Sequence, residues 1–509
     1  MTPLPTAFLA MLQIGNPGTG SLAERAVAEL AALRPAVTTS AWLAAHPDDV
    51  FRPFRRDSIR ENDEGWCARA TRTERLADGM RMVRRAYFYP PEPPPSLALP
   101  SVGGPTLLRE ECVLGTVWIE AGVADSAAGS ASAASVRQAL IAAHGPVQPG
   151  PDVFFGRVAT DTQRRLLSRM PEAEALLLGL HYFGAGAWRT PGRWQVDSTV
   201  IVSAFDRGFD RRRSNGRVLV FAHLPVAKLG THQGAIDRDE AVERRQAALA
   251  GQAARLSGLD AARTDRLMAT LAAADSAYHE LGATSPKALD SVVVVVIQDW
   301  IASARPLAAP QRAAALLAAD QFLGSAPMLF VRAQRQDTSR VAYERLGAVF
   351  ARDELGGGYN YTHNWLDEAM RVDPQGPISR LGELALLRIG FNETGMCGGG
   401  SEAFRRVITA GERLLGGPLD TATAAEVHRL VGDAYADIVA LAAGAGSEYA
   451  DAAAYVGEAP TARNRAISHY RQALALDHVS QEASSAWLEA WRLIAGLPPT
   501  TTHFFCVYD

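Results

Sequence analysis

Two segments carry residue types that could bind phosphate. The glycine-rich run at residues 15–20 follows a short apolar stretch and precedes a helical pattern, as a phosphate-binding loop does. Such a loop needs a lysine after its last glycine, but Ser21 stands there, so we expect a turn ahead of a capped helix. The second segment, residues 207–213, carries four arginines beside Asp206 and Asp210. The two aspartates partly neutralise it, which favours a solvated loop.

His46, Asp48 and Asp49 are the residues best spaced to hold a metal. They resemble the first metal-binding motif of the zinc-dependent N-acetylglucosaminyl deacetylases. The resemblance implies His46 and Asp49 as zinc ligands and Asp48 as the general base. Val50 replaces the family's glutamate, however, and no later histidine pair completes the three protein ligands that a catalytic zinc needs. We therefore expect a helix ended by Pro47, with both aspartates solvated and no metal bound.

Residues 356–365 combine three glycines with aromatic and amide side chains. Such side chains bind partners at modest entropic cost, so this segment is a candidate to line a binding groove. The alternative is a turn that leads into a new helix capped by Thr362, with the aromatic rings in the core. The candidate partner-binding residues are Tyr359, Asn360, Tyr361, His363, Asn364 and Trp365.

The four cysteines fall into two pairs, Cys67 with Cys112 and Cys397 with Cys506, each within one expected domain. Two disulfides are therefore plausible, and they would favour an exported or periplasmic protein. The alternative is four buried thiols in a cytoplasmic protein. No Cys-x-x-Cys motif occurs, so zinc or thioredoxin-type chemistry has no support.

Composition excludes several classes of function. The 509 residues are 48% hydrophobic and 21% charged, with a formal net charge of −4, as in a folded globular protein. The chain has no excess of basic residues of the kind that indicates a nucleic-acid partner. The longest purely apolar run, residues 292–297, is far shorter than the roughly 20 residues of a membrane span. We find no complete catalytic set and expect no cofactor.

The first part of the chain has the pattern of an α+β module with antiparallel hairpins, over residues 21–230. Ser21 and Glu24 form a capping box ahead of a helix. Asp78-Gly79 is suited to a two-residue type I′ hairpin turn, and residues 123–135 are small enough for a flexible linker. The expected strands cover 66–76, 80–89, 112–121, 198–205 and 217–224.

From residue 237 onward the pattern is helical almost without a break, including 286–304, where a buried helix is favoured over a strand. Gly432 with Tyr435 in one expected helix, and Ala466 with Tyr470 in another, match the small-and-large pattern of paired helices in tetratricopeptide repeats. Residues 340–495 thus resemble a degenerate repeat of that family, with an irregular helical bundle as the alternative. The resemblance implies a helical stack that offers a face to partners, and implies no chemistry.

These patterns predict a multidomain chain: an N-terminal segment (1–20), the α+β module (21–230), a helical segment (237–335), and tetratricopeptide-like repeats with a docked C-terminal tail (336–509). Three hypotheses for its function follow. The first is a non-enzymatic binding or assembly protein that holds a protein or peptide partner. The second is a hydrolase with its site in the α+β module, and the third is a structural cell-envelope protein, supported by the cysteine pairs alone.

Overall fold

The structure is a computed structural model of the whole chain. It describes residues 20–34, 37–53, 67–100, 109–123, 126–147, 188–196, 199–206, 216–224, 246–281, 287–325, 337–352, 359–393, 400–444 and 453–499. The predicted N-terminal segment (1–20) lies outside this part except for its last residue, and so does the tail from residue 500.

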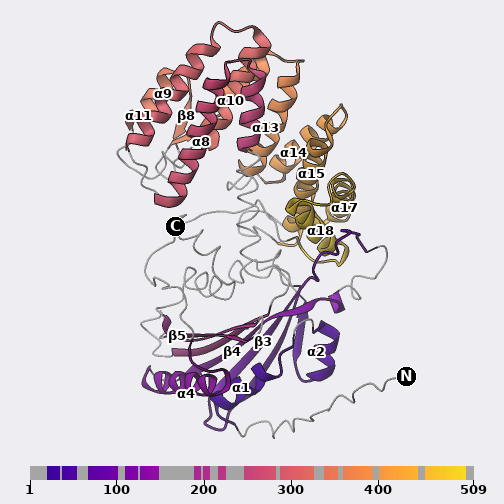
Figure 1. Cartoon of the computed structure of the whole chain (residues 1–509). Helices are drawn as coiled ribbons and strands as arrows, with labels where there is room; N and C mark the ends of the chain where they lie inside the picture. Colours follow the sequence, from indigo (N-terminus) through magenta and orange to yellow (C-terminus); the bar gives the residue numbers. More distant parts are fainter. Residues whose placement is uncertain are drawn as a thin grey trace, which may run out of the picture.

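An antiparallel sheet forms the N-terminal part (Figure 1). Within the described residues it has seven strands in the order β1-β2-β3-β4-β7-β6-β5. The predicted class, an α+β part with antiparallel strands followed by a mostly helical part, is confirmed at this level. The strands are β1 (Val50–Pro53), β2 (Ala68–Arg75), β3 (Arg81–Tyr89), β4 (Val113–Val123), β5 (Trp188–Val196), β6 (Thr199–Asp206) and β7 (Gly216–His223).

The hairpin between β2 and β3 turns at Asp78-Gly79, but the predicted two-residue type I′ turn is wrong. The amide of Leu76 donates to the Met80 carbonyl (2.8 Å), and the amide of Gly79 donates to the Leu76 carbonyl (2.9 Å). Three residues therefore lie between the last paired positions. Gly79 closes this loop at φ +82°, a left-handed conformation that glycine adopts without steric cost.

Helices cover one face of the sheet (Figure 1). α1 (Leu22–Ala31) starts at the predicted capping box of Ser21 and Glu24, and α2 (Thr39–Ala45) follows it. α4 (Ser126–His144) packs against α1 and strands β4 to β7. The predicted linker at 123–135 is therefore wrong for most of its length, because its alanines favour helix and its small side chains allow close packing.

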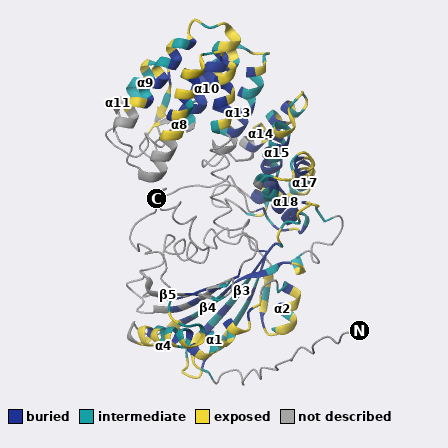
Figure 2. Ribbon diagram, viewed as in Figure 1, coloured by how far each residue is buried: buried dark blue, intermediate teal, exposed yellow. Residues whose placement is uncertain are grey.

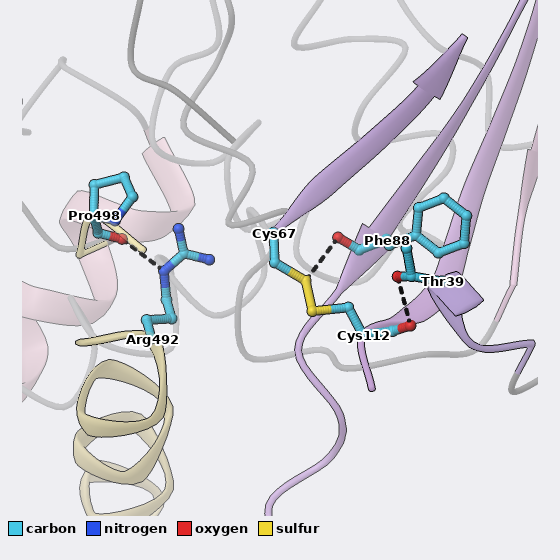
Figure 3. Close-up of a disulfide and its surroundings, with 6 residues drawn as sticks. All are labelled: Thr39, Cys67, Phe88, Cys112, Arg492 and Pro498. Atoms are coloured by element: carbon cyan, nitrogen blue, oxygen red, sulfur yellow. Dashed lines mark hydrogen bonds between the residues drawn. A yellow bond between two sulfur atoms is a disulfide. The ribbon is translucent and has the colours of Figure 1, made fainter. Parts of the chain in front are cut away.

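A disulfide fixes one end of the sheet (Figure 3). Cys67, just before β2, is bonded to Cys112, just before β4, so the bond spans the intervening β3. Both cysteines are fully buried. Thr39 at the start of α2 donates its hydroxyl to the Cys112 carbonyl (3.0 Å), which ties α2 to the same end. The Cys67–Cys112 pairing is confirmed, whereas Cys397 and Cys506 lie outside the described residues.

The second half is helical, as predicted, and the apolar run at 292–297 lies inside a helix rather than a strand. Residues 246–256 are helical. The helices after them are, in chain order, α8 (Ala261–Leu281), α9 (Lys287–Ala304), α10 (Ala309–Ser325), α11 (Asp337–Arg345), α12 (Asn364–Val372), α13 (Pro377–Glu393), α14 (Gly400–Leu415), α15 (Thr421–Ala442), α16 (Ala453–Val456), α17 (Ala459–Leu476) and α18 (Gln481–Ile494).

The helical pattern predicted from residue 237 onward is interrupted after α11. α11 stops at Arg345, and Gly347 takes φ +99°, which turns the chain out of the helix. Residues Phe350–Arg352 then form the short strand β8, which pairs antiparallel with β9 (Tyr359–Tyr361). This small hairpin leads directly into α12.

Buried apolar side chains form two clusters, and Figure 2 shows where buried residues lie along the ribbon. One runs from residue 249 to residue 385 and centres on α10, whose residues 313–323 are all buried. The other joins the sheet with its helices to the helices from α13 to α18. At that junction Trp487 of α18 donates its indole N–H to the Ala98 carbonyl (3.1 Å), in the connection after β3. The domain boundaries predicted from the sequence remain predictions.

The end of the described chain packs back onto α18. Leu497 is buried, and Arg492 donates its Nε to the Pro498 carbonyl (2.9 Å), which Figure 3 also shows. None of the helices in the described ranges has both the length and the apolar character that crossing a membrane requires.

Candidate functional site

The predicted aromatic segment surrounds one buried carboxylate. Asp320 of α10 has no exposed surface. Its Oδ1 accepts hydrogen bonds from the Tyr361 hydroxyl (2.8 Å) and the Leu366 amide (3.2 Å), and its Oδ2 lies 3.0 Å from His363 Nδ1. Burial, and then the charge of Asp320, raise the pKa of Tyr361, which therefore stays a neutral hydrogen-bond donor.

This arrangement caps helix α12 from outside its own segment. The N-cap residue is His363 rather than Thr362, and its side chain makes no capping bond. Asp320 and the Tyr361 hydroxyl instead accept from amides of the first turn. His363 holds φ +57°, a left-handed conformation that is costly for a non-glycine residue. The contacts to Asp320 thus fix α12 against α10.

The other candidates in this segment differ in how far they face solvent. Trp365 is 2% exposed and packs edge-on against Tyr361. Asn364 is half-buried and bonds the backbone of residues 347 and 349 through both side-chain atoms. Tyr359 is 37% exposed, with the Arg340 guanidinium 4.2 Å from its ring centre. Asn360 belongs to β9, and its side chain is outside the description. Partner binding by this segment remains a prediction, and it depends on the exposed ring of Tyr359.

The residues of the possible metal motif, His46, Asp48 and Asp49, differ in exposure and in the side chains that they contact. Asp48 is 76% exposed, as predicted, but Asp49 is buried, so its predicted solvation is wrong. The Trp42 indole (2.9 Å) and Arg84 (2.5 Å) each donate to a different oxygen of Asp49. The His46 ring stacks on Trp42 at 4.1 Å. Across the described ranges, no group of three or more His, Cys, Asp or Glu side chains is placed to hold a metal ion.

The helix pair predicted from Gly432 and Tyr470 lies together in the structure as α15 and α17. A Cβ atom on Gly432 would meet the Tyr470 ring at 2.9 Å, so glycine is what allows the two helices to approach. Tyr470 is fully buried and donates its hydroxyl to Asp433 (2.7 Å), which also accepts from Arg429 (2.7 Å). The bond from Tyr470 fixes the rotation of α15 against α17, and Arg429 holds the Asp433 carboxylate from within α15.

Next to this crossing, three helices present a titratable cluster, which we call the histidine face. His428 and His469 lie with their Nδ1 atoms 3.1 Å apart. The Tyr435 ring packs against His469, and its hydroxyl donates to Glu412 (3.0 Å). Glu412 and Arg465 are exposed, Tyr435 and His428 are half-buried, and His469 is 8% exposed. The histidine face comprises Glu412 of α14, His428 and Tyr435 of α15, and Arg465 and His469 of α17.

Burial controls the charge of this cluster. It lowers the pKa of His428, and burial with the neighbouring His428 lowers the pKa of His469 to about 4. Burial and the hydrogen bond to Glu412 raise the pKa of Tyr435. Near pH 7 the face therefore offers neutral imidazoles and a phenol between one exposed acid and one exposed base. It can donate and accept hydrogen bonds and stack on a partner's side chains.

Sequence reasoning missed the histidine face, although a signal for it was present. The predicted pair of Gly432 with Tyr470 places the residue one turn before Gly432 and the residue next to Tyr470 at the same crossing. Those positions hold His428 and His469. Glu412, by contrast, comes from the preceding helix, and its position depends on how α14 packs on α15.

No family model, curated protein or solved structure matches this chain.

Proposed function

We propose that this chain is a non-enzymatic binding or assembly protein, which holds a protein or peptide partner on a helical scaffold of the tetratricopeptide-like kind. The observation that carries the proposal is the order of helix packing. α12 packs on α13, α13 on α14, α14 on α15, α15 on α17 and α17 on α18. Packing between successive helices is typical of stacked repeats, which present an extended face to their partners.

The histidine face is the proposed contact surface. It draws side chains from three helices of this series, and exposed or half-buried aromatic and polar groups are common in partner interfaces. The aromatic segment is a weaker alternative, because Tyr361 and Trp365 are used inside the protein. The disulfide between Cys67 and Cys112 favours an oxidising compartment, which makes an exported or periplasmic location part of the proposal.

The test is affinity purification of the intact chain from its native cells, in parallel with the variants Tyr435→Ala and Tyr359→Ala. Both changes remove a partly exposed aromatic ring, one from the histidine face and one from the aromatic segment. We expect the intact chain and Tyr359→Ala to retain a stoichiometric protein or peptide and Tyr435→Ala to lose it. Loss with Tyr359→Ala alone would move the site to the aromatic segment. Absence of a partner from the intact chain would refute the proposed function.

A further inference from the structure

Two histidines form a direct contact between helices α15 and α17 of the C-terminal stack. His428 of α15 and His469 of α17 lie with Nδ1 atoms 3.1 Å apart and ring centres 5.2 Å apart. One turn further along α15, Gly432 allows the close approach to α17. The contact therefore lies one helical turn from a tightly packed crossing, which resists a change in the separation of the two helices.

A hydrogen bond between neutral rings accounts for this distance. One Nδ1 must carry a hydrogen and donate, while the other must accept through its lone pair. The described residues place no third His, Cys, Asp or Glu with the pair as metal ligands, and the nearby Glu412 accepts from Tyr435. His428 is the more exposed ring. It is therefore the better donor, because a first extra proton can reside on its other nitrogen and strengthen the bond.

A second extra proton has no favourable position. It would have to occupy Nδ1 of His469, where two N–H groups and two positive charges would then face each other. His469 is 8% exposed, so water can do little to screen this repulsion. The two rings thus titrate as a coupled pair, and the doubly charged form is incompatible with the closed contact.

The charged neighbours do not remove this penalty. Glu412 of α14 favours a charged His469, whereas Arg465 of α17 opposes it. Arg388 of α13 is paired with Glu426 of α15, and Glu458, before α17, is paired with Arg405 of α14. On the α18 side, Glu489 acts on Tyr470 rather than on the histidines. Among the groups that act on His469, Glu412 is therefore the one that offsets the repulsion. Its carboxylate is already bonded to Tyr435.

We propose that the His428–His469 pair is an acid-sensitive contact, which holds α15 to α17 while at most one extra proton is bound and releases them when both rings are charged. The pKa of His469 is lowered in the folded protein, so the contact is fully stabilising above the unfolded value of 6.5 and weakens as the pH falls from 6.5 towards about 4. This inference does not depend on the proposed function.

The test is amide hydrogen exchange of the intact chain at pH 7.5 and pH 5, with rates corrected for their intrinsic pH dependence. Helix α9, which contains no histidine, serves as the internal reference. For a shift from 6.5 to about 4, protection of α15 and α17 should fall by up to about 30-fold at pH 5. In His469→Gln most of this pH-dependent decrease should disappear, because glutamine does not titrate in this range, and only the smaller part that comes from the burial of His428 should remain.

Unchanged relative protection in the intact chain at pH 5 would overturn the proposal, as would an equal decrease in His469→Gln. If His469→Gln does not fold, His428→Gln takes its place. Removing the neighbouring charge should then reduce the decrease without abolishing it, and an undiminished decrease would overturn the proposal.

Discussion

Replacing Asp320 with alanine should release helix α12 from α10. The change removes the acceptor for the Tyr361 hydroxyl, the His363 ring and the Leu366 amide, at a position with no exposed surface. A buried donor left without a partner costs about 1–3 kcal/mol. The Leu366 amide retains a bond to the His363 carbonyl (3.0 Å), so the loss falls on three side chains: Tyr361, His363 and Gln321, whose amide also donates to Asp320 (3.2 Å). At about 1 kcal/mol or more for each of these side chains, we expect Asp320→Ala to cost about 3 kcal/mol or more.

Hydrogen exchange of the intact chain measures this loss at α12, because the free energy of local opening sets the protection of its amides. The control is Asp367→Ala, which removes an exposed carboxylate from the same helix and should cost at most about 0.5 kcal/mol. Asp320→Asn keeps an oxygen for Tyr361 and should fall between the two. Protection of α12 in Asp320→Ala equal to that in Asp367→Ala would refute the assignment of Asp320 as the group that caps the helix.

Two further predictions concern packing and covalent constraint. Gly432→Ala should destabilise the α15–α17 pair by about 1 kcal/mol, because overpacking against Tyr470 outweighs the gain in helix propensity. Gly457 has open space around it, so Gly457→Ala should be nearly neutral. Hydrogen exchange measures both effects. Replacing Cys67 and Cys112 with serine removes a constraint between positions 45 residues apart and should cost about 4 kcal/mol in denaturant unfolding of the sheet part. Equal effects of the two glycine changes, or unaltered unfolding without the disulfide, would contradict the respective arguments.

Strands were predictable where β-branched residues and turn signals coincide, as in β6 and β7. β5 was missed because Pro191 and Gly192 interrupt its pattern, and the structure has a register shift between Arg189 and Gly192. α4 was missed over half its length because small residues occur both in linkers and in closely packed helices. The choice depends on whether α1 and the sheet are present to pack against it, which local sequence does not determine.

In the candidate site, too, some features could be predicted from the sequence and others could not. Gly432 and Tyr470 identified the helix pair, since a missing side chain opposite a large ring is a local signature of close approach. The role of Asp320 could not be predicted, because its partners lie more than 40 residues away. The prominent aromatics Tyr361 and Trp365 indicated a surface, but burial is equally favourable for such rings and is where the structure places them.

The most direct test of the proposed scaffold is mild chemical cross-linking of the intact chain in its native cells, followed by mass-spectrometric mapping of the linked peptides. We predict a stoichiometric protein or peptide partner whose cross-links cluster on α14, α15 and α17, around the histidine face. No partner above background, or cross-links confined to the N-terminal sheet, would contradict a partner-binding role for the helical stack.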